Sequence, residues 1–97
     1  MLAYEWLEFE GDPAKDRLNQ KKHGVAFKTA EQAFYNPQRI IMQNVRHSEK
    51  ERRYFCYGLA DGGVLTVRFT LRGDKIRIIG AAYWREGKRI YAEKNRL

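Results

Sequence analysis

Two turns of this sequence carry side chains that could handle protons and phosphates. The first supplies His47, Glu51 and Arg52, and the second is flanked by Arg72 and Arg77. An arginine fork matches two phosphate oxygens at once, and a positioned histidine or glutamate transfers protons. These groups suit the cleavage of RNA, because RNA brings its own nucleophile in the 2′-hydroxyl.

Such cleavage gives a protein three tasks: taking the proton of the 2′-hydroxyl, stabilising the charge on phosphorus and protonating the leaving oxygen. Arg72 and Arg77 are candidates for holding the phosphate. Glu51 or His47 could transfer the proton, with Arg52 orienting that acid or contacting RNA. A plainer interpretation stays open, in which His47 is a surface turn residue, Glu51 and Arg52 form an exposed ion pair, and the two other arginines are solvated hairpin charges.

Positive charge gathers in the last third of the chain. Residues 72–97 hold eight Lys/Arg against three Asp/Glu, a surplus of +5 within a net charge of +7. Residues 1–12 carry four acids and no Lys/Arg, so the remainder nets +11. Arginines on a sheet suit a phosphate backbone, and the same charge also suits an acidic protein. The further candidates for RNA binding are Lys22, His23, Arg68 and Arg85, although Lys22 and His23 are also typical of a helix end.

Composition excludes several classes of protein. Ninety-seven residues predict one domain over 1–97, no apolar run reaches the ~20 residues of a membrane helix, and the acidic start does not resemble a secretion signal. Cys56 is the only cysteine, so we expect a buried, inert thiol in a reducing cytoplasm. His23 and His47 lie far apart without ligand spacing, so we expect neither a metal nor another cofactor.

The N-terminal third predicts one strand and two helices. Residues 2–9 alternate between apolar and polar and predict the strand. A cap and a first-turn proline predict a helix over 13–23, and Gly24 suits a left-handed ending. A second helix is predicted over 27–35, where apolar residues recur at helical spacing, and Asn36-Pro37 ends it.

The rest of the chain predicts a meander of strands and a last helix. The strands are expected over 39–46, 53–59, 64–71 and 75–82, and the helix over 83–95. Leu65, Val67, Phe69 and Leu71 should point to one side of the sheet, and Thr66, Arg68, Thr70 and Arg72 to the other. Trp84 and Tyr91 are most simply core contacts of the last helix, with base stacking as the alternative. The fold class is therefore α+β, an antiparallel sheet packed against two N-terminal helices and one C-terminal helix.

Motifs over nearly the whole chain match one known family in order. They are Asp12-Pro13-Ala14-Lys15, Asn19, Lys22-His23-Gly24-Val25-Ala26-Phe27, Ala30, Phe34, Asn36-Pro37, His47, Glu51-Arg52, Gly58, Val64-Leu65-Thr66-Val67, Thr70, Arg72, Arg77-Ile78-Ile79 and Tyr91. The Lys-His-Gly-Val element followed by Phe is the most specific of them. On these residues the sequence resembles the BrnT-family toxins.

The resemblance implies a compact toxin with a RelE-like fold that stops growth by cleaving RNA. A cognate antitoxin encoded beside it, commonly with a ribbon-helix-helix or related DNA-binding domain, would neutralise it. The complex would contact operator DNA only through the antitoxin. The positions that the resemblance favours are Glu51, Arg52, Arg72 and Arg77, followed by Lys22, His23 and His47.

One segment departs from the family pattern. The family commonly reads Ser-Ala-Arg after the Arg-Ile-Ile element, whereas this chain has Gly80-Ala81-Ala82. An arginine expected near the site is therefore absent, and Arg85, three residues on, is the candidate to replace it. This departure keeps a second hypothesis open, in which the protein is a basic module that binds nucleic acid or an acidic antitoxin without cutting.

Overall fold

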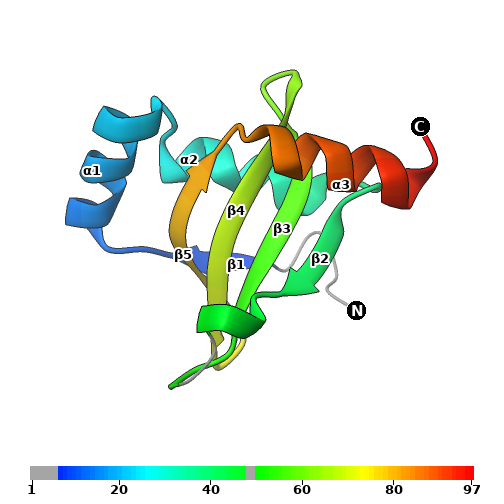
Figure 1. Cartoon of the computed structure of the whole chain (residues 1–97). Coiled ribbons are helices and arrows are strands. Elements are labelled where there is room, and N and C mark those ends of the chain that lie inside the picture. The colour runs from blue at the N-terminus through cyan, green and yellow to red at the C-terminus, as the bar shows by residue number, and fades with distance from the viewer. Residues whose placement is uncertain (1–6, 48–49) are drawn as a thin grey trace.

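The computed structural model of the chain describes residues 7–47 and 50–97. A five-stranded sheet in the order β1-β5-β4-β3-β2 forms its centre (Figure 1). The strands are β1 (Glu8–Glu10), β2 (Ile40–Gln43), β3 (Arg53–Ala60), β4 (Gly63–Arg72) and β5 (Lys75–Ala82). The helical segments are α1 (Pro13–His23), α2 (Phe27–Ala30), η2 (Glu31–Tyr35), η3 (Val45–His47) and α3 (Arg85–Asn95). The predicted α+β class is confirmed.

The antiparallel meander is confirmed for β2 to β5, and the edge strand β1 adds a parallel pair. Glu10 of β1 lies in register with Arg77 of β5. No tight turn joins these two strands, so the chain between them leaves the direction of β1 free. The part of the predicted first strand before Leu7 lies outside the described residues. The strand predicted over 39–46 is shorter than expected, because Asn44 and η3 follow Gln43.

Helix α1 forms where its caps predict it and is fixed to the sheet by one side chain. Gly24 ends the helix at φ 68° and donates its backbone N–H to Gln20. The buried amide of Asn19 donates to the carbonyls of Val25 and Ala81 at 2.8 and 2.9 Å, and its Oδ1 accepts from the N–H of Ala81 at 3.1 Å. Two of these buried hydrogen bonds hold α1 against β5, and the third fixes the chain just after the helix.

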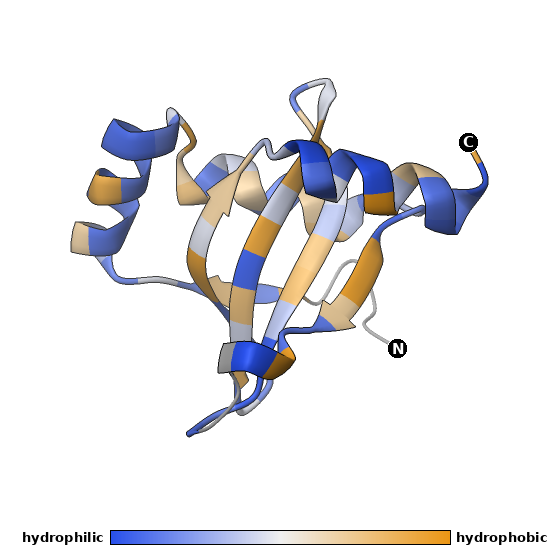
Figure 2. Ribbon diagram, viewed as in Figure 1, coloured by the Kyte–Doolittle hydropathy of each residue, from blue (hydrophilic) through white to orange (hydrophobic). Residues whose placement is uncertain are grey.

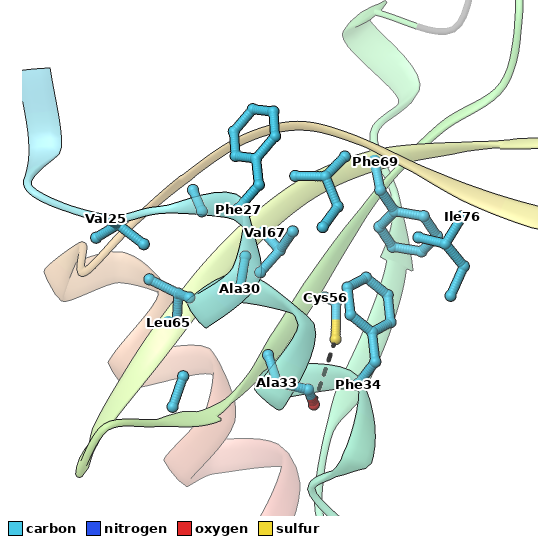
Figure 3. Close-up of a cluster of buried hydrophobic side chains, with 13 residues drawn as sticks. Val25, Phe27, Ala30, Ala33, Phe34, Cys56, Leu65, Val67, Phe69 and Ile76 are labelled. Carbon is cyan, nitrogen blue, oxygen red and sulfur yellow. Dashed lines mark hydrogen bonds between the residues drawn. The ribbon is translucent and has the colours of Figure 1, made fainter. Parts of the chain in front are cut away.

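The core lies between one face of the sheet and the segment α2–η2 (Figure 3). The predicted second helix is confirmed, although its second half is a 3-10 helix. Phe34 is fully buried and packs edge-on against Phe69, with ring centroids 4.9 Å apart. Segment η2 can lie close to the sheet because β3 has Gly58, where a β-carbon would stand 2.4 Å from the carbonyl oxygen of Ala33.

Cys56 is buried in this core, as predicted. Its Sγ lies 3.8 Å from the carbonyl oxygen of Ala33, to which the thiol donates (Figure 3). Burial raises the pKa of the thiol to about 12, against the opposing effect of the Arg39 charge. The thiol therefore stays protonated and serves packing rather than chemistry.

The other face of the sheet is covered only in part, by α3 (Figure 1). Gly87 allows this helix to approach, because a β-carbon there would stand 2.0 Å from Oγ1 of Thr66. Tyr91 is buried, as predicted for a core contact. The same prediction was wrong for Trp84, which keeps 39% of its surface exposed because it lies before the first turn of α3. None of the described helices is long and apolar enough to cross a membrane.

Candidate functional site

The face of the sheet that α3 leaves open presents the arginines of β4. Leu65, Val67 and Phe69 are buried in the core, so the alternate residues Arg68 and Arg72 point to the opposite face, as the period of a strand requires. Figure 2 shows the resulting alternation of hydrophilic and hydrophobic positions along β4. Leu71 follows the same alternation but is largely exposed at the end of the strand.

A pocket of about 240 Å³ opens between α1 and this face. Its lining residues are Lys15, Leu18, Asn19, Lys22, His23, Arg68 and Ile79. Three of the four predicted RNA-binding residues, Lys22, His23 and Arg68, therefore meet in one place although they come from α1 and β4. The hydrogen bonds of Asn19 hold the two elements together.

A second pocket of about 160 Å³ shares Arg68 and Ile79 with the first and adds Asn44 and Arg53. We call the two pockets together the Arg68 cleft. Its floor is the sheet, and its walls are α1 on one side and the start of the connection from β2 to β3 on the other. Such a concave surface with several cations suits an extended polyanion.

Arg68, at the centre of the cleft, carries a positive charge that no carboxylate of the described residues neutralises. Its Nε is buried without a hydrogen-bond partner, and within residues 7–47 and 50–97 its guanidinium has no carboxylate partner. Nη2 lies over Gly80 of the neighbouring strand, where a β-carbon would stand 2.6 Å away. Because a partly buried cation without a counterion is unfavourable, an anion bound in the cleft would stabilise it.

An aromatic residue borders the cleft at its α1 end. The ring of Trp84 meets that of His23 edge-on, with centroids 5.7 Å apart and planes at 82°. Trp84 is well exposed, so its ring remains available to a further partner. This arrangement favours the base-stacking alternative for Trp84 over the core contact.

The predicted catalytic residues lie at the other end of the same sheet face, around the ends of β3, β4 and β5. Nη2 of Arg72 lies 3.9 Å from Oε2 of Glu51, an exposed pair. Nη1 of Arg77 lies 3.4 Å from Oε1 of Glu10, with both side chains a quarter to a third exposed. Both arginines thus have a carboxylate partner within the protein, which distinguishes them from Arg68.

Two other predicted residues also lie near this end. The carbonyl oxygen of Arg52 accepts a hydrogen bond of 2.6 Å from Oγ1 of Thr70, which fixes the backbone and leaves the arginine side chain exposed. His47 is the last residue of η3. Among the described residues, no group of three His, Cys, Asp or Glu side chains has the arrangement of a metal site.

Arg85 lies apart from the other predicted RNA-binding residues. It lines a different pocket, between α3 and the hairpin of β3 and β4, rather than the Arg68 cleft. Ala82, at the position where the resemblance led us to expect an arginine, is buried opposite Thr66. The structure thus places no cation at this position.

Sequence reasoning missed two cationic residues of the cleft, Lys15 and Arg53. Lys15, Leu18 and Lys22 are spaced at i, i+3 and i+7, so one face of the helix could have been identified from the sequence. Arg53 is in register with Thr70 on the open face. Its position depends on the strand pairing, which the sequence specified less directly.

Comparison with known proteins adds a family assignment to this geometry. The family described as "Ribonuclease toxin, BrnT, of type II toxin-antitoxin system" matches residues 12–87. The match includes every residue that lines the Arg68 cleft. A search of curated proteins found no similar protein.

Proposed function

Because this chain belongs to the BrnT family of ribonuclease toxins of type II toxin–antitoxin systems, we propose that it cleaves RNA in the Arg68 cleft without a metal ion. The observation that carries the proposal is the position of Arg68, whose guanidinium has no carboxylate partner among the described residues and shares a pocket with Lys22 and His23. A phosphate diester would supply the missing negative charge.

Arg68 and Lys22 would hold the phosphate that is cut. The fork of Arg68 can contact two of its oxygens and stabilise the additional negative charge that develops when the 2′-oxygen attacks phosphorus. Lys22, an exposed residue of α1, can approach as a flexible point charge.

His23 is the proton-transfer group inside the cleft. An imidazole can take the proton of the 2′-hydroxyl and return one to the leaving 5′-oxygen near neutral pH. The bond from phosphorus to the 5′-oxygen breaks as the bond to the 2′-oxygen forms, which leaves a 2′,3′-cyclic phosphate and a 5′-hydroxyl. Glu51 and His47, the groups predicted for proton transfer, belong to the end of the face where Glu51 pairs with Arg72, so they would act on the bound RNA strand away from this phosphate.

Arg72, Arg77 and Arg52 would hold the RNA strand beyond the cut. Arg72 lies four residues from Arg68 on the same strand face, about 13 Å at ~3.3 Å per residue, so the two arginines reach different phosphates. RNA would compete with Glu51 for Arg72 and with Glu10 for Arg77. At the other end of the cleft, Trp84 would stack on a base.

A cognate antitoxin with a ribbon-helix-helix or related DNA-binding domain would neutralise the protein in the cytoplasm. Operator DNA would be contacted through that antitoxin. Cleavage of cellular RNA would inhibit translation and stop growth.

Induced expression of matched variants tests the proposal. Wild type should arrest growth and produce new RNA ends. Arg68→Ala should abolish both effects, and Lys21→Ala, which changes an exposed lysine of α1 outside the cleft, should leave them intact. The double variant Arg72→Ala/Arg77→Ala should weaken cleavage to a smaller extent, because these arginines bind away from the cut. Intact RNA with soluble wild type would contradict ribonuclease activity.

The second candidate function is a basic module that binds RNA or an acidic antitoxin without cutting. The buried Ala82, in place of the arginine common in the family, is the observation that favours it. Growth arrest by wild type with tight, salt-sensitive RNA binding and no new RNA ends would support this alternative.

A further inference from the structure

A second concave surface lies on the other side of α3 from the cleft. An open pocket of about 890 Å³ lies between α3 and the hairpin of β3 and β4, and we call it the α3 pocket. Its apolar lining includes Leu59, Tyr83 and Trp84, residues that are 42%, 45% and 39% exposed. Exposed apolar residues gathered in a hollow are typical of a surface that binds a partner.

The two cations of α3 that line the α3 pocket have no carboxylate partner among the described residues, whereas the next cation of the helix, Arg89, has two. Arg85 and Lys88 both line the pocket, and their side chains have no ion-pair or hydrogen-bond partner among the described residues. By contrast, Arg89 points away and is held by Glu86 and Glu93 of the same helix. Two cations of α3 that have no partner among the described residues therefore lie side by side in the lining of the pocket.

We propose that an acidic, amphipathic segment of the cognate antitoxin docks in the α3 pocket, an inference that rests on the proposed function. Apolar side chains of the segment would cover Leu59 and Tyr83, and its carboxylates would pair with Arg85 and Lys88. Helix α3 has 11 residues, about 16 Å at ~1.5 Å per residue. That length accommodates about three turns of a docked helix.

Docking here would also restrict access to the Arg68 cleft. Trp84 lines the α3 pocket and contacts His23, which lines the cleft. A segment seated on Trp84 would remove it from RNA and reach the border of the cleft without filling it. RNA is the less suitable occupant, because a phosphate backbone would pair with Arg85 and Lys88 but would leave the exposed Leu59 uncovered, whereas an amphipathic peptide can satisfy both.

Two matched pairs of variants test the docking site. Leu59→Ala removes an exposed leucine of the pocket, and Leu71→Ala removes one of similar exposure, 45%, elsewhere on the sheet. Lys88→Glu reverses a pocket charge, and Lys94→Glu reverses an exposed charge on α3 outside it. The probe is the full-length antitoxin encoded beside the toxin gene. Its affinity is measured by calorimetry, RNA cleavage is assayed separately, and thermal unfolding confirms that each variant is folded.

We expect Leu59→Ala and Lys88→Glu each to weaken antitoxin binding at least tenfold and their controls to change it less than threefold. Equal affinities within each pair would overturn the proposal. So would a result in which Lys88→Glu impairs RNA binding but not antitoxin binding, since the pocket would then be an RNA surface. Pocket-dependent antitoxin binding by a wild type that cuts no RNA would support the docking site while contradicting the ribonuclease mechanism.

Discussion

The guanidinium of Arg68 lies over Gly80 of the adjacent strand, so close that a β-carbon at Gly80 would stand 2.6 Å from Nη2. Glycine at this position therefore sets where the central cation of the cleft can lie. The segment Gly80-Ala81-Ala82, where the resemblance led us to expect Ser-Ala-Arg, thus has a structural consequence in this chain. Its glycine leaves room for the guanidinium of Arg68.

Substituting Gly80 by alanine should displace Arg68 and reduce RNA cleavage at least tenfold. The melting temperature should change little, because the β-carbon meets the far end of a flexible side chain rather than backbone. In the Arg68→Ala background the same substitution should cause no further loss, since neighbouring residues that act together are non-additive. Steady-state cleavage of a short RNA measures all three variants, and additive losses would show that Gly80 acts by another route.

Substituting each partner of the Arg77–Glu10 ion pair in turn distinguishes a structural role of Arg77 from a role in RNA binding. Arg77→Ala and Glu10→Gln both remove the ion pair, so each should lower the free energy of unfolding by up to about 1 kcal/mol. Only Arg77→Ala removes a group that could bind phosphate, so it alone should reduce cleavage. Urea unfolding and the cleavage assay measure the two effects. Equal losses of activity would indicate that the arginine serves the fold.

Trp84 should stack on a base of the bound RNA. Trp84→Ala should weaken RNA binding by about tenfold, within the range of 1–3 kcal/mol per stacked base, and Trp84→Phe should restore part of it. In a Trp6→Phe background Trp84 is the only tryptophan. RNA should then quench its fluorescence. Unchanged affinity in the alanine variant would exclude stacking.

The buried thiol of Cys56 should make the protein less stable in alkali. Burial raises its pKa from 9.0 to about 12, so above about pH 9 the unfolded chain releases a proton that the folded chain keeps. The free energy of unfolding should therefore fall by up to ~1.4 kcal/mol per pH unit between these values. Burial also raises the pKa of Tyr57 and Tyr83, which acts in the same direction. Urea unfolding across this range should show a smaller slope for Cys56→Ala, and an identical slope would refute the assignment.

The sequence predicted the elements well because their signals are local. The cap before α1, Gly24 after it, and the alternation of β4 each depend on a few neighbouring residues, and each is confirmed. The exposure of Trp84 was not predicted, because an aromatic residue next to an amphipathic helix gives the same pattern whether it is buried or lies before the first turn. The parallel direction of β1 is likewise a property of the whole chain rather than of its three residues.

The Arg68 cleft could be predicted only as a set of residue types. Lys22, His23 and Arg68 were recognised as candidates, but their meeting depends on hydrogen bonds between Asn19 and Ala81, which are 62 positions apart. The sequence favoured Arg72 and Arg77, rather than Arg68, for holding the phosphate, and only the structure shows that these two have carboxylate partners. Long-range packing therefore decides which of these three arginines is left without a carboxylate partner.

Cleavage of RNA by the purified protein in excess EDTA tests the central claim most directly. A defined single-stranded RNA is incubated with wild type, Arg68→Ala and Lys21→Ala, and the new ends are identified by mass spectrometry. We predict 2′,3′-cyclic phosphate and 5′-hydroxyl ends from wild type and Lys21→Ala, with the rate at least a hundredfold lower for Arg68→Ala. Intact RNA with wild type, cleavage that EDTA abolishes, or full activity in Arg68→Ala would contradict the claim.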